Sequence, residues 1–547
     1  GIRPAMRRKD SMDFVQPRHE ELAAFMACAH AKYTGEVGVC MATSGPGAIH
    51  LLNGLYDANR SGAPVLAIAS HIPSQYIGSE YFQETHPDRI FTECSVYSEL
   101  VSTPQQCPAV VSSAIQFAVT SPGVSVVTLP GDLADSDAAV EARPFAVPAP
   151  SAVVPSDETV ERMAQALNSA KKVAIFAGIG VAGAHDEVIA LADTLKAPVG
   201  HSLRGKDQIQ YDNPFDVGMT GLLGYGAAAE GLHDADVMVM LGTDFPYDQF
   251  LPDVTTIQVD TDPTVIGRRT GVDIPVHGDV KSTILKLLPE LTVKSDRSFL
   301  DKTLAKHDKL MNKAVGAYTR KVEKITPIHP EYAASILDQV AAEDAVFTAD
   351  TGMCNVWSAR YINPLGTRRI LGSYLHGSMA NALPQAIGAQ LADPGRQVIS
   401  MSGDGGLSML MGELLTLATY NLPVTVVVFN NSTLGMVKLE MLVDGLPDFG
   451  VDVPQANYAQ IATAMGMQGI RVEKPKDLES AFTTALAHQG PSVVEVITDP
   501  NALSIPPEIK KDQVFGFATA MSRIVLNRGV GEAVSMARSN LRNIPRG

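Results

Sequence analysis

The stretch that decides the fold expected for this chain is GDGGLSMLMGELLTLATYNLPVTVVVFNN, residues 403–431. The apolar run just before it, 397–402, is typical of a buried strand. A Leu- and Met-rich helical pattern covers 407–420, and a second buried strand is expected at 424–429, ending at Asn430 and Asn431. Strand, Gly-rich turn, helix and strand form a βαβ unit, and such units bind ligands at the carboxyl ends of their parallel strands.

The residue types in this unit suit a metal-bound diphosphate. Glycines at 405 and 406 let the backbone approach phosphate oxygens, and the N-terminus of the following helix attracts negative charge. Asp404 offers a carboxylate oxygen and Asn431 an amide oxygen, and Mg²⁺ binds a few such oxygens together with phosphate and water. A lone Gly-Asp-Gly is more often an ordinary tight turn, but Asn-Asn at the end of the next strand makes the pattern more specific.

The same stretch resembles the thiamine-diphosphate motif of the pyruvate oxidase and acetolactate synthase superfamily. The resemblance implies that Mg²⁺ is held by Asp404, Asn431 and the backbone carbonyl of Thr433. Met379 matches the bulky apolar residue that keeps the cofactor bent, although on its own it would indicate only packing at a helix start. The positions that the resemblance assigns to thiamine diphosphate are Ser378, Met379, Ala380, Asp404, Gly405, Gly406, Asn431, Ser432, Thr433, Leu434, Gly435 and Met436.

The composition is that of a globular protein with several cores. A chain of 547 residues is too long for one core and predicts three or four domains. No apolar run is long enough to span a bilayer. The formal net charge of −16 argues against a nucleic-acid partner held through phosphate contacts. The five cysteines lack Cys-x-x-Cys spacing, which suggests reduced thiols in a cytosolic protein.

Strand and helix patterns alternate along most of the chain and predict three doubly wound, parallel-sheet α/β domains. With the resemblance, these are a pyrimidine-binding domain (1–133), a Pro-rich linker (134–156), a central FAD-binding domain (157–325) and a diphosphate-binding domain (326–500). A C-terminal helical tail follows over 501–547, with apolar residues at helical spacing in 514–525 and 532–541 and arginines beside them. Such stripes fit core packing, and a basic amphipathic end can also bind an anionic membrane surface. The strands expected are 37–42, 65–69, 124–129, 173–177, around 199, 237–241, 256–259, 345–349, 397–402, 424–429 and 492–497.

A catalytic carboxyl group is implied in Arg18-His-Glu-Glu21. By itself Glu20 would be a solvated or capping carboxylate. Members of the superfamily carry a Glu in a similar motif, where it hydrogen-bonds N1′ of the aminopyrimidine so that the cofactor can remove its own C2 proton. Phe82 and Gln83 match a pair that, in the pyruvate oxidase subgroup, lies between the thiamine C2 and the flavin, and we assign them to the substrate.

The FAD site is expected mainly from the resemblance. A strand that ends in Asp can hold a ribose hydroxyl, and 242–247 and 258–263 both follow buried strands. No complete Gly-x-Gly-x-x-Gly follows a strand here. Further candidate contacts are Gly178, 201–206 and 221–224. The residues assigned to FAD are Thr243, Asp244, Phe245, Pro246, Asp260, Thr261, Asp262, Pro263, Thr264 and Asp279.

The resemblance covers about 18–542 and is strongest to the flavin-dependent pyruvate:quinone oxidoreductases. It implies that pyruvate is decarboxylated on thiamine diphosphate, that electrons pass to FAD and then to a membrane quinone, and that acetate is released. It also implies a homotetramer in the cytoplasm, held at the inner face of the cell membrane by the binding of the tail to anionic lipids.

Other functions remain open. A pyruvate oxidase that uses O₂ and phosphate would make acetyl phosphate, and an acetolactate synthase-like carboligase would share Glu20, Asp404, Asn431 and even the flavin. A non-catalytic homologue would keep only the fold, and the intact residues argue against it. The sequence departs from the superfamily pattern twice. The piece 1–16 is short and irregular where a strand and helix are normal, which we interpret as a truncated or disordered segment. Met436 stands where some members carry an aromatic residue.

Overall fold

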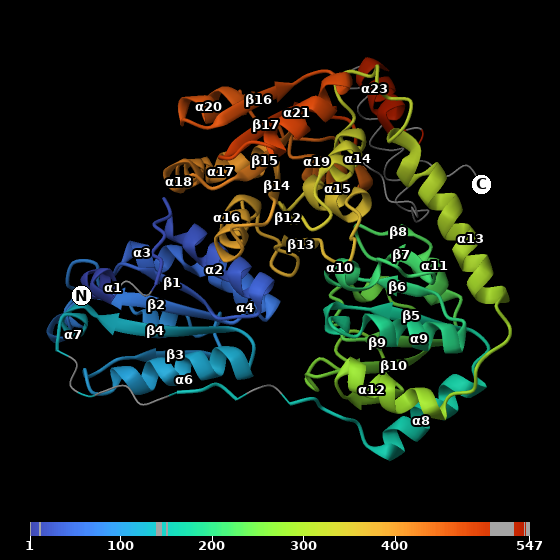
Figure 1. Cartoon of the computed structure of the whole chain (residues 1–547), viewed down its shortest axis with the longest axis horizontal. Helices are drawn as coiled ribbons and strands as arrows, with labels where there is room; N and C mark the ends of the chain where they lie inside the picture. The colour runs from blue at the N-terminus through green and yellow to red at the C-terminus, as the bar shows by residue number, and fades with distance from the viewer. Residues whose placement is uncertain are drawn as a thin grey trace.

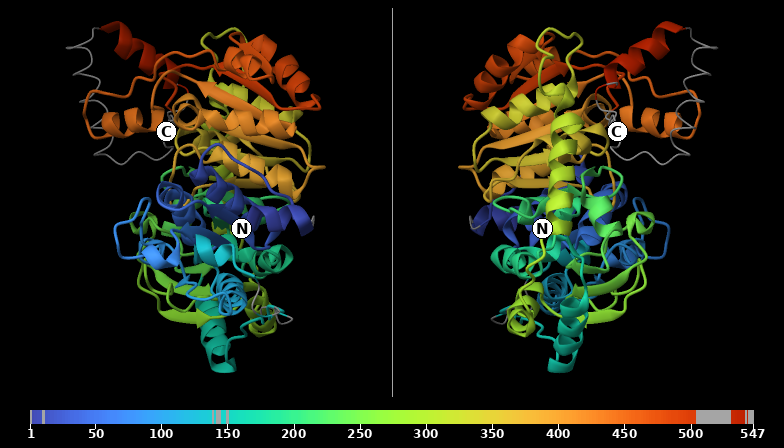
Figure 2. Two further views of the ribbon diagram at one scale, coloured as in Figure 1. Left: turned by 90° about the vertical axis from the view of Figure 1, so that its left-hand side faces the viewer. Right: turned by 90° about the vertical axis from the view of Figure 1, so that its right-hand side faces the viewer.

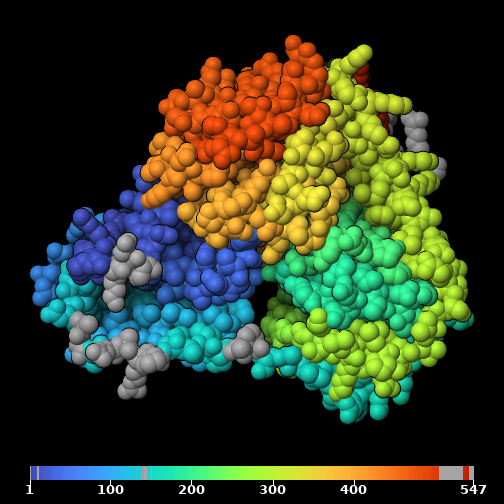
Figure 3. Space-filling model, in the orientation of Figure 1, coloured from blue at the N-terminus to red at the C-terminus, as the bar shows by residue number. Residues whose placement is uncertain are grey.

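Three parallel sheets, each covered by helices on both faces, build the molecule (Figure 1). This computed structural model describes residues 2–9, 12–137, 140, 145–148, 151–503, 530–540 and 542. The lobe that contains the third sheet lies against both of the others (Figures 2 and 3). The prediction of three doubly wound α/β domains is confirmed.

The first sheet has the strand order β1-β2-β4-β3. Alternate residues of β2 face opposite sides: Val65 and Ala67 pack toward helices α2 and α4, whereas Leu66 packs toward α6. Strand β3 was not predicted because it is a short edge strand with no fully buried residue. The elements are α2 (Glu20–Thr34), β1 (Gly38–Ala42), α4 (Leu52–Ser61), β2 (Val65–His71), β3 (Tyr97–Leu100), α6 (Cys107–Thr120) and β4 (Val124–Pro130).

The central sheet has the order β11-β10-β9-β5-β6-β7-β8, and only the last pair is antiparallel. Helices α8, α9 and α12 cover one face, and α11 packs on the other. Strands β7, β8 and β11, each at most four residues long, were not predicted. The elements are α8 (Asp157–Ser169), β5 (Val173–Ala177), α9 (His185–Leu195), β6 (Val199–His201), β7 (Asp216–Met219), β8 (Tyr225–Gly226), α11 (Ala228–His233), β9 (Val237–Leu241), β10 (Thr255–Asp260), β11 (Ile274–His277) and α12 (Val280–Leu287).

The third sheet has the order β13-β12-β14-β15-β17-β16. In β15, Val424, Val426 and Val428 face α16, α20 and α2 of the first domain, and Val427 and Phe429 face α14, α15 and α21. Helix α2 therefore belongs to the packing of two domains. The elements are α14 (Pro330–Val340), β12 (Val346–Ala349), α15 (Met353–Tyr361), β13 (Arg369–Gly372), α16 (Ala382–Ala392), β14 (Val398–Gly403), β15 (Val424–Asn430), α20 (Tyr458–Ala464), β16 (Gln468–Val472), α21 (Leu478–Leu486) and β17 (Ser492–Ile497).

Two local expectations were wrong. The N-terminal piece expected to be irregular contains α1 (Ile2–Lys9), whose Ile2 packs on an apolar cluster of the first domain. The single helix expected over 407–420 is broken into α17 (Asp404–Met409), a 3₁₀ turn and α18 (Leu414–Tyr420). Gly412 lies in the 3₁₀ turn, and glycine weakens a helix interior.

The last described helix is α23 (Val530–Asn540), close to the second helix expected in the tail. Its Met536 is fully buried against Leu503 and two leucines of α19 (Gly435–Val443). The side-chain amide of Asn540 donates to the carbonyl of Asn501 at 2.6 Å. The helix expected at 514–525 lies outside the described residues, as does part of the expected linker. None of the described helices combines the length and the hydropathy that a membrane-spanning segment needs.

Candidate active site

The carboxyl edge of the third sheet brings three polar side chains to the ends of neighbouring strands. Asp350 follows β12, Asp404 follows β14 and Asn431 follows β15, and these strands pair in that order. Two of the three side chains, those of Asp404 and Asn431, line one cavity. The expected cofactor residues that line it are Met379, Asp404, Gly405, Gly406, Asn431, Thr433, Leu434, Gly435 and Met436. Ser378, Ala380 and Ser432 are adjacent in sequence but are not part of the lining.

Asp404 is buried and fixed by the loop that follows β15. Its carboxylate accepts from the backbone amide of Ser432 at 2.8 Å, and its carbonyl accepts from the hydroxyl of Tyr458 at 3.0 Å. Burial raises the pKa of Asp404 to about 6, although hydrogen bonds from the amides of Gly405 and Ser432 oppose the rise. Asn431 accepts from the amide of Thr433 at 3.1 Å, so its amide oxygen is also held in place. A bound cation would favour the charged form of Asp404.

Asp350 lies between the turn at Gly405 and Gly406 and the turn that carries Met379. Its carboxylate accepts from the backbone amide and the side-chain amide of Asn381, each at 3.1 Å. Ala380, between Met379 and Asn381, has a left-handed φ of 64°. A Cβ on Gly406 would lie 1.8 Å from the Asp350 Oδ2, so only glycine allows this approach. Burial raises the pKa of Asp350 to about 7.

The cavity lining fits a metal-bound diphosphate. Its one carboxylate, Asp404, and its one side-chain amide, Asn431, are oxygen ligands of the kind that Mg²⁺ binds. Among the described residues that line the cavity there is no Lys or Arg, so a diphosphate here needs a cation to balance its charge. Asp404, Asn431 and the carbonyl of Thr433 would hold the metal, which when bound would anchor the diphosphate of the cofactor. Met379 and Leu434 supply apolar surface beside it.

Glu20 begins α2 on the first domain, in a cluster with two histidines. The Nδ1 of His50 donates to the Glu20 carboxylate at 3.0 Å, and the rings of His50 and His19 stack at 4.4 Å. Burial tends to raise the pKa of Glu20, but the hydrogen bonds from His50 and from the backbone outweigh it and hold the pKa below its usual value. About a third of the Glu20 side chain is exposed in a single chain (34%).

Phe82 and Gln83 lie on a surface loop near the same end of the first domain. Gln83 has a left-handed φ of 64° and its amide oxygen accepts from the hydroxyl of Ser44 at 3.3 Å. Phe82 is 78% exposed, so most of its ring is open to contact in a single chain. Neither residue, nor Glu20, is part of the lining of the cavity beside Asp404. The structure therefore leaves the expected catalytic residues of one chain apart from its own diphosphate cavity.

A second, larger cavity lies between the central and third domains. Of the residues expected to bind FAD, the lining contains Thr243, Asp244, Phe245 and Pro246. The turn before them is possible because Gly242 has a φ of 57° and a Cβ there would lie 2.4 Å from the Cα of Gly180. The other expected FAD residues lie outside the lining, and they are Asp260, Thr261, Asp262, Pro263, Thr264 and Asp279.

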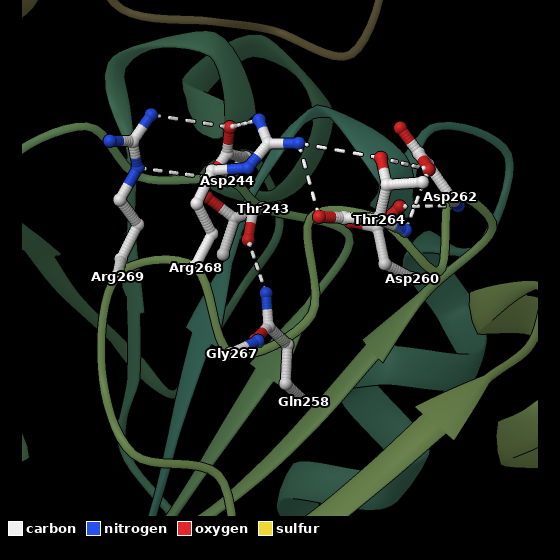
Figure 4. Close-up of polar contacts among 9 residues, drawn as sticks. All are labelled: Thr243, Asp244, Gln258, Asp260, Asp262, Thr264, Gly267, Arg268 and Arg269. Carbon is white, nitrogen blue, oxygen red and sulfur yellow. Dashed lines mark hydrogen bonds and ion pairs between the residues drawn. The ribbon is translucent and has the colours of Figure 1, made fainter.

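Local hydrogen bonds and ion pairs engage three of these outer residues and Asp244 of the lining at the carboxyl edge of the central sheet (Figure 4). Asp244 accepts from Arg268 at 2.9 Å and from Arg269 at 3.0 Å, so its charge is balanced within the protein. Asp260 accepts from the amide of Asp262 at 3.0 Å, and burial raises its pKa. Asp279 caps α12 by accepting from the amide of Ser282 at 2.8 Å.

The two cavities are neighbours. Thr351, Gly352 and Met436 line both of them and form the wall between them. The larger cavity fits a flavin-sized group, because its lining is mostly apolar. Three residues of the lining, Thr220, Asn355 and Tyr374, each have a fully buried polar atom without a partner among the described residues.

The sequence matches three family models that follow one another along the chain. They are described as thiamine pyrophosphate enzyme N-terminal TPP binding domain (residues 2–90), central domain (160–287) and C-terminal TPP binding domain (350–496). YdaP of Bacillus subtilis (strain 168), whose name describes it as thiamine pyrophosphate-containing, is 36% identical over 533 residues, which cover 97% of this chain and 92% of YdaP.

This chain belongs to the thiamine-diphosphate-dependent pyruvate oxidase and acetolactate synthase superfamily. A pyruvate oxidase from Lactiplantibacillus plantarum is 31% identical over 501 residues, covering 89% of this chain and 82% of the oxidase. An acetolactate synthase from Arthrospira platensis is 30% identical over 514 residues, covering 88% and 86%. The chain is thus similar to both an oxidase and a carboligase, and thiamine diphosphate is the cofactor common to the superfamily.

Sequence reasoning missed the third-domain residues that follow β12, although they line both cavities. Thr351 and Gly352 are shared by the two linings, and Asn355 faces the larger one. A signal was present, because 345–349 was predicted as a strand and Asp350-Thr-Gly352 follows it as Asp404-Gly-Gly406 follows its own strand. Tyr374 and Thr220 carry no comparable motif.

Proposed function

We propose that this enzyme converts pyruvate oxidatively to acetate and CO₂, with thiamine diphosphate, Mg²⁺ and FAD, and that its electrons are passed to a membrane quinone. One pyruvate, one water and one quinone would give one acetate, one CO₂ and one quinol. The observation that carries the proposal is the pair of adjacent cavities, because electron transfer between two cofactors requires that they lie close together. Thr351, Gly352 and Met436 would separate them.

Within this proposal each residue has a chemical task. Asp404, Asn431 and Thr433 hold the metal, and Met379 supports the bend of the cofactor from the turn fixed by Asp350. When bound, thiamine diphosphate supplies the nucleophilic carbon and the electron sink for decarboxylation. Glu20 holds a proton at the aminopyrimidine N1′, and His50 orients its carboxyl group through their hydrogen bond. Phe82 and Gln83 enclose the small keto acid and exclude water.

We also propose that the active site is completed by a second copy of the chain, as part of a homotetramer. Glu20, Phe82 and Gln83 lie outside the cavity of their own chain, and Phe82 is highly exposed. Contact with the third domain of a partner would bury Glu20, and burial favours the protonated carboxylic acid that the chemistry needs. A two-fold axis would make two such sites at once.

The quinone step requires the enzyme to reach a membrane surface. We propose that it does so peripherally, from the cytoplasmic side, through the C-terminal tail. Support comes from the basic amphipathic pattern of the tail sequence. Liposomes of anionic lipid should therefore bind the full chain more tightly than a chain ending at residue 503.

An anaerobic absorption spectrum tests the redox proposal. The full chain with thiamine diphosphate and Mg²⁺ should show a flavin band that pyruvate bleaches and that a soluble quinone analogue restores. The Glu20→Gln variant should keep the band but lose the bleaching. A band that pyruvate leaves unchanged would contradict the proposal and favour an acetolactate synthase-like carboligase. Bleaching that O₂ and phosphate reverse faster than the quinone does would favour acetyl phosphate production.

A further inference from the structure

Two side chains attach the start of α2, which carries Glu20, to elements beside the diphosphate cavity of the same chain. One is Glu413, the last residue of the 3₁₀ turn between α17 and α18 (Met411–Glu413). The other is Asn53, in the first turn of α4. Each makes a hydrogen bond to a residue next to Glu20 or two positions from it, and the proposed function gives neither of them a task.

Glu413 holds the backbone that enters α2. This residue is fully buried, and its carboxylate accepts from the backbone amide of Arg18 at 2.9 Å. Arg18 comes two residues before Glu20, and His19 between them is the N-cap of the helix. A buried carboxyl group is costly unless it is hydrogen-bonded, so the bond to Arg18 fixes both partners. Because Glu413 follows α17, which begins at Asp404, the metal-binding end of the cavity and the start of α2 are connected.

Asn53 bridges the first and third domains through both its amide nitrogen and its amide oxygen. The nitrogen donates to the Glu21 carboxylate at 2.7 Å and to the Ser378 hydroxyl at 2.9 Å. The oxygen accepts from Nε2 of His376 at 2.7 Å. The Ser378 hydroxyl in turn donates to the carbonyl of Met379 at 2.9 Å. A continuous set of hydrogen bonds therefore joins Glu21 to the turn that carries Met379.

We propose that Glu413 and Asn53 are positioning residues for Glu20. They hold the chain just before and just after Glu20, so that its carboxyl group stays within reach of N1′ of the aminopyrimidine, while His50 orients the carboxyl group itself. A misplacement of about 1 Å at a reacting group can cost about a hundredfold in rate. The inference rests on the proposed role of Glu20. In the proposed shared site, the cavity turns of each chain would thus position the carboxyl group that serves its partner.

Exchange of the C2 proton of bound thiamine diphosphate for deuterium tests this positioning, since it needs the aminopyrimidine and Glu20 but no pyruvate, flavin or quinone. The full chain, saturated with thiamine diphosphate and Mg²⁺, is mixed with D₂O and quenched with acid, and the remaining C2 proton is measured by NMR. Asn53→Ala and Glu413→Leu should each slow the exchange about tenfold or more. Glu413→Gln keeps an oxygen that can accept from the Arg18 amide, so it should restore most of the rate lost in Glu413→Leu.

Cofactor affinity is the second measurement, and Trp357 reports it. This residue is the only tryptophan in the sequence and lines the diphosphate cavity, so its fluorescence should change on titration with thiamine diphosphate and Mg²⁺. Neither Asn53→Ala nor Glu413→Leu removes a proposed metal ligand, so the affinity should fall less than the exchange rate does. A loss of affinity as large as the loss of exchange rate would indicate damage to the cofactor cavity and overturn the positioning role.

Asn59→Ala is the matched control. Asn59 lies in the same helix as Asn53 and accepts from the amide of Val124 at 3.2 Å, within the first domain. Its loss should leave the exchange rate close to that of wild type. Equal rates in Asn53→Ala and Asn59→Ala would overturn the assignment of Asn53, and this pair decides even if Glu413→Leu fails to fold. Equal rates in Glu413→Leu and Glu413→Gln would overturn the assignment of Glu413.

The outcome can be separated from that of the redox proposal. Slow exchange in Asn53→Ala and Glu413→Leu would support the positioning role even if pyruvate fails to bleach the flavin band, because exchange precedes any redox step. A wild-type protein that exchanges the C2 proton no faster than free thiamine diphosphate would overturn the proposed role of Glu20 and this inference with it.

Discussion

Gly406→Ala is the substitution whose effect the structure defines most sharply. The added Cβ would lie 1.8 Å from Oδ2 and 2.8 Å from Cγ of Asp350, and contacts under 3.0 Å are essentially absent from real structures. Asp350 cannot simply recede, because Asn381 and the amide of Thr351 hold its carboxylate. Overpacking of this kind costs about 1–3 kcal/mol. Each bond that Asp350 gives up adds roughly 0.5–1.5 kcal/mol.

The clash should affect cofactor binding as well as stability, since Gly406 and Met379 both line the diphosphate cavity. We expect Gly406→Ala to weaken Mg²⁺-dependent binding of thiamine diphosphate by about tenfold or more, measured by isothermal titration calorimetry. Gly412→Ala is the control, because a Cβ at Gly412 meets nothing within 4 Å. Asp350→Ala in the same chain should relieve part of the defect, as expected for directly coupled residues. Equal affinities in the Gly406 and Gly412 variants would refute the reasoning.

Three further predictions concern the site and its supports. Burial raises the pKa of Asp404 to about 6, and Mg²⁺ needs the charged carboxylate. Calorimetry between pH 5 and 8 should therefore show the affinity for Mg²⁺ falling about tenfold per pH unit below about pH 6. Asp404→Asn should bind Mg²⁺ weakly at every pH. Gln258→Leu removes the hydrogen bonds of this side chain with Thr243 and Gly267 and should lower the free energy of unfolding by about 2–3 kcal/mol. Asp244→Asn weakens a partly exposed ion pair and should lower it by about 1 kcal/mol or less. Denaturant titration measures both differences. Met536→Ala should weaken α23 docking by about 2–5 kcal/mol and speed limited proteolysis near the C-terminus, while Val534→Ala, at an exposed position, should not.

The parts of the fold and site that could be predicted were those encoded locally. Asp404 and Asn431 lie in one βαβ segment, so hydrophobic pattern and turn residues were enough to place them at adjacent strand ends. The sequence did not predict the edge strands β3, β13 and β16. Strand β13 has only four residues, and most residues of β3 and β16 are only partly buried, so their apolar pattern is weak. The break in the helix expected over 407–420 was missed because its Leu and Met pattern continues through Gly412.

Other features depend on contacts between distant segments. The contact between Asp350 and Gly406 depends on the pairing of β12 with β14. The sequence around each strand does not indicate which other strand it pairs with. The unpaired state of Asn355 and Tyr374 is visible only once two domains enclose a cavity. The importance of Glu20 came from the resemblance alone, since a carboxylate at the start of a helix is ordinary.

The most direct test of the account is to ask whether one active site is made from two chains. Glu20→Gln and Asp404→Ala chains are purified separately, unfolded or dissociated, mixed and reassembled, and pyruvate-dependent reduction of a quinone analogue is measured. Each variant alone should be inactive. Random pairing in the mixture should restore about a quarter of the wild-type sites, because one site of each mixed pair then has neither substitution. A mixture that is shown to contain mixed pairs and is as inactive as its parents would contradict a site shared between chains.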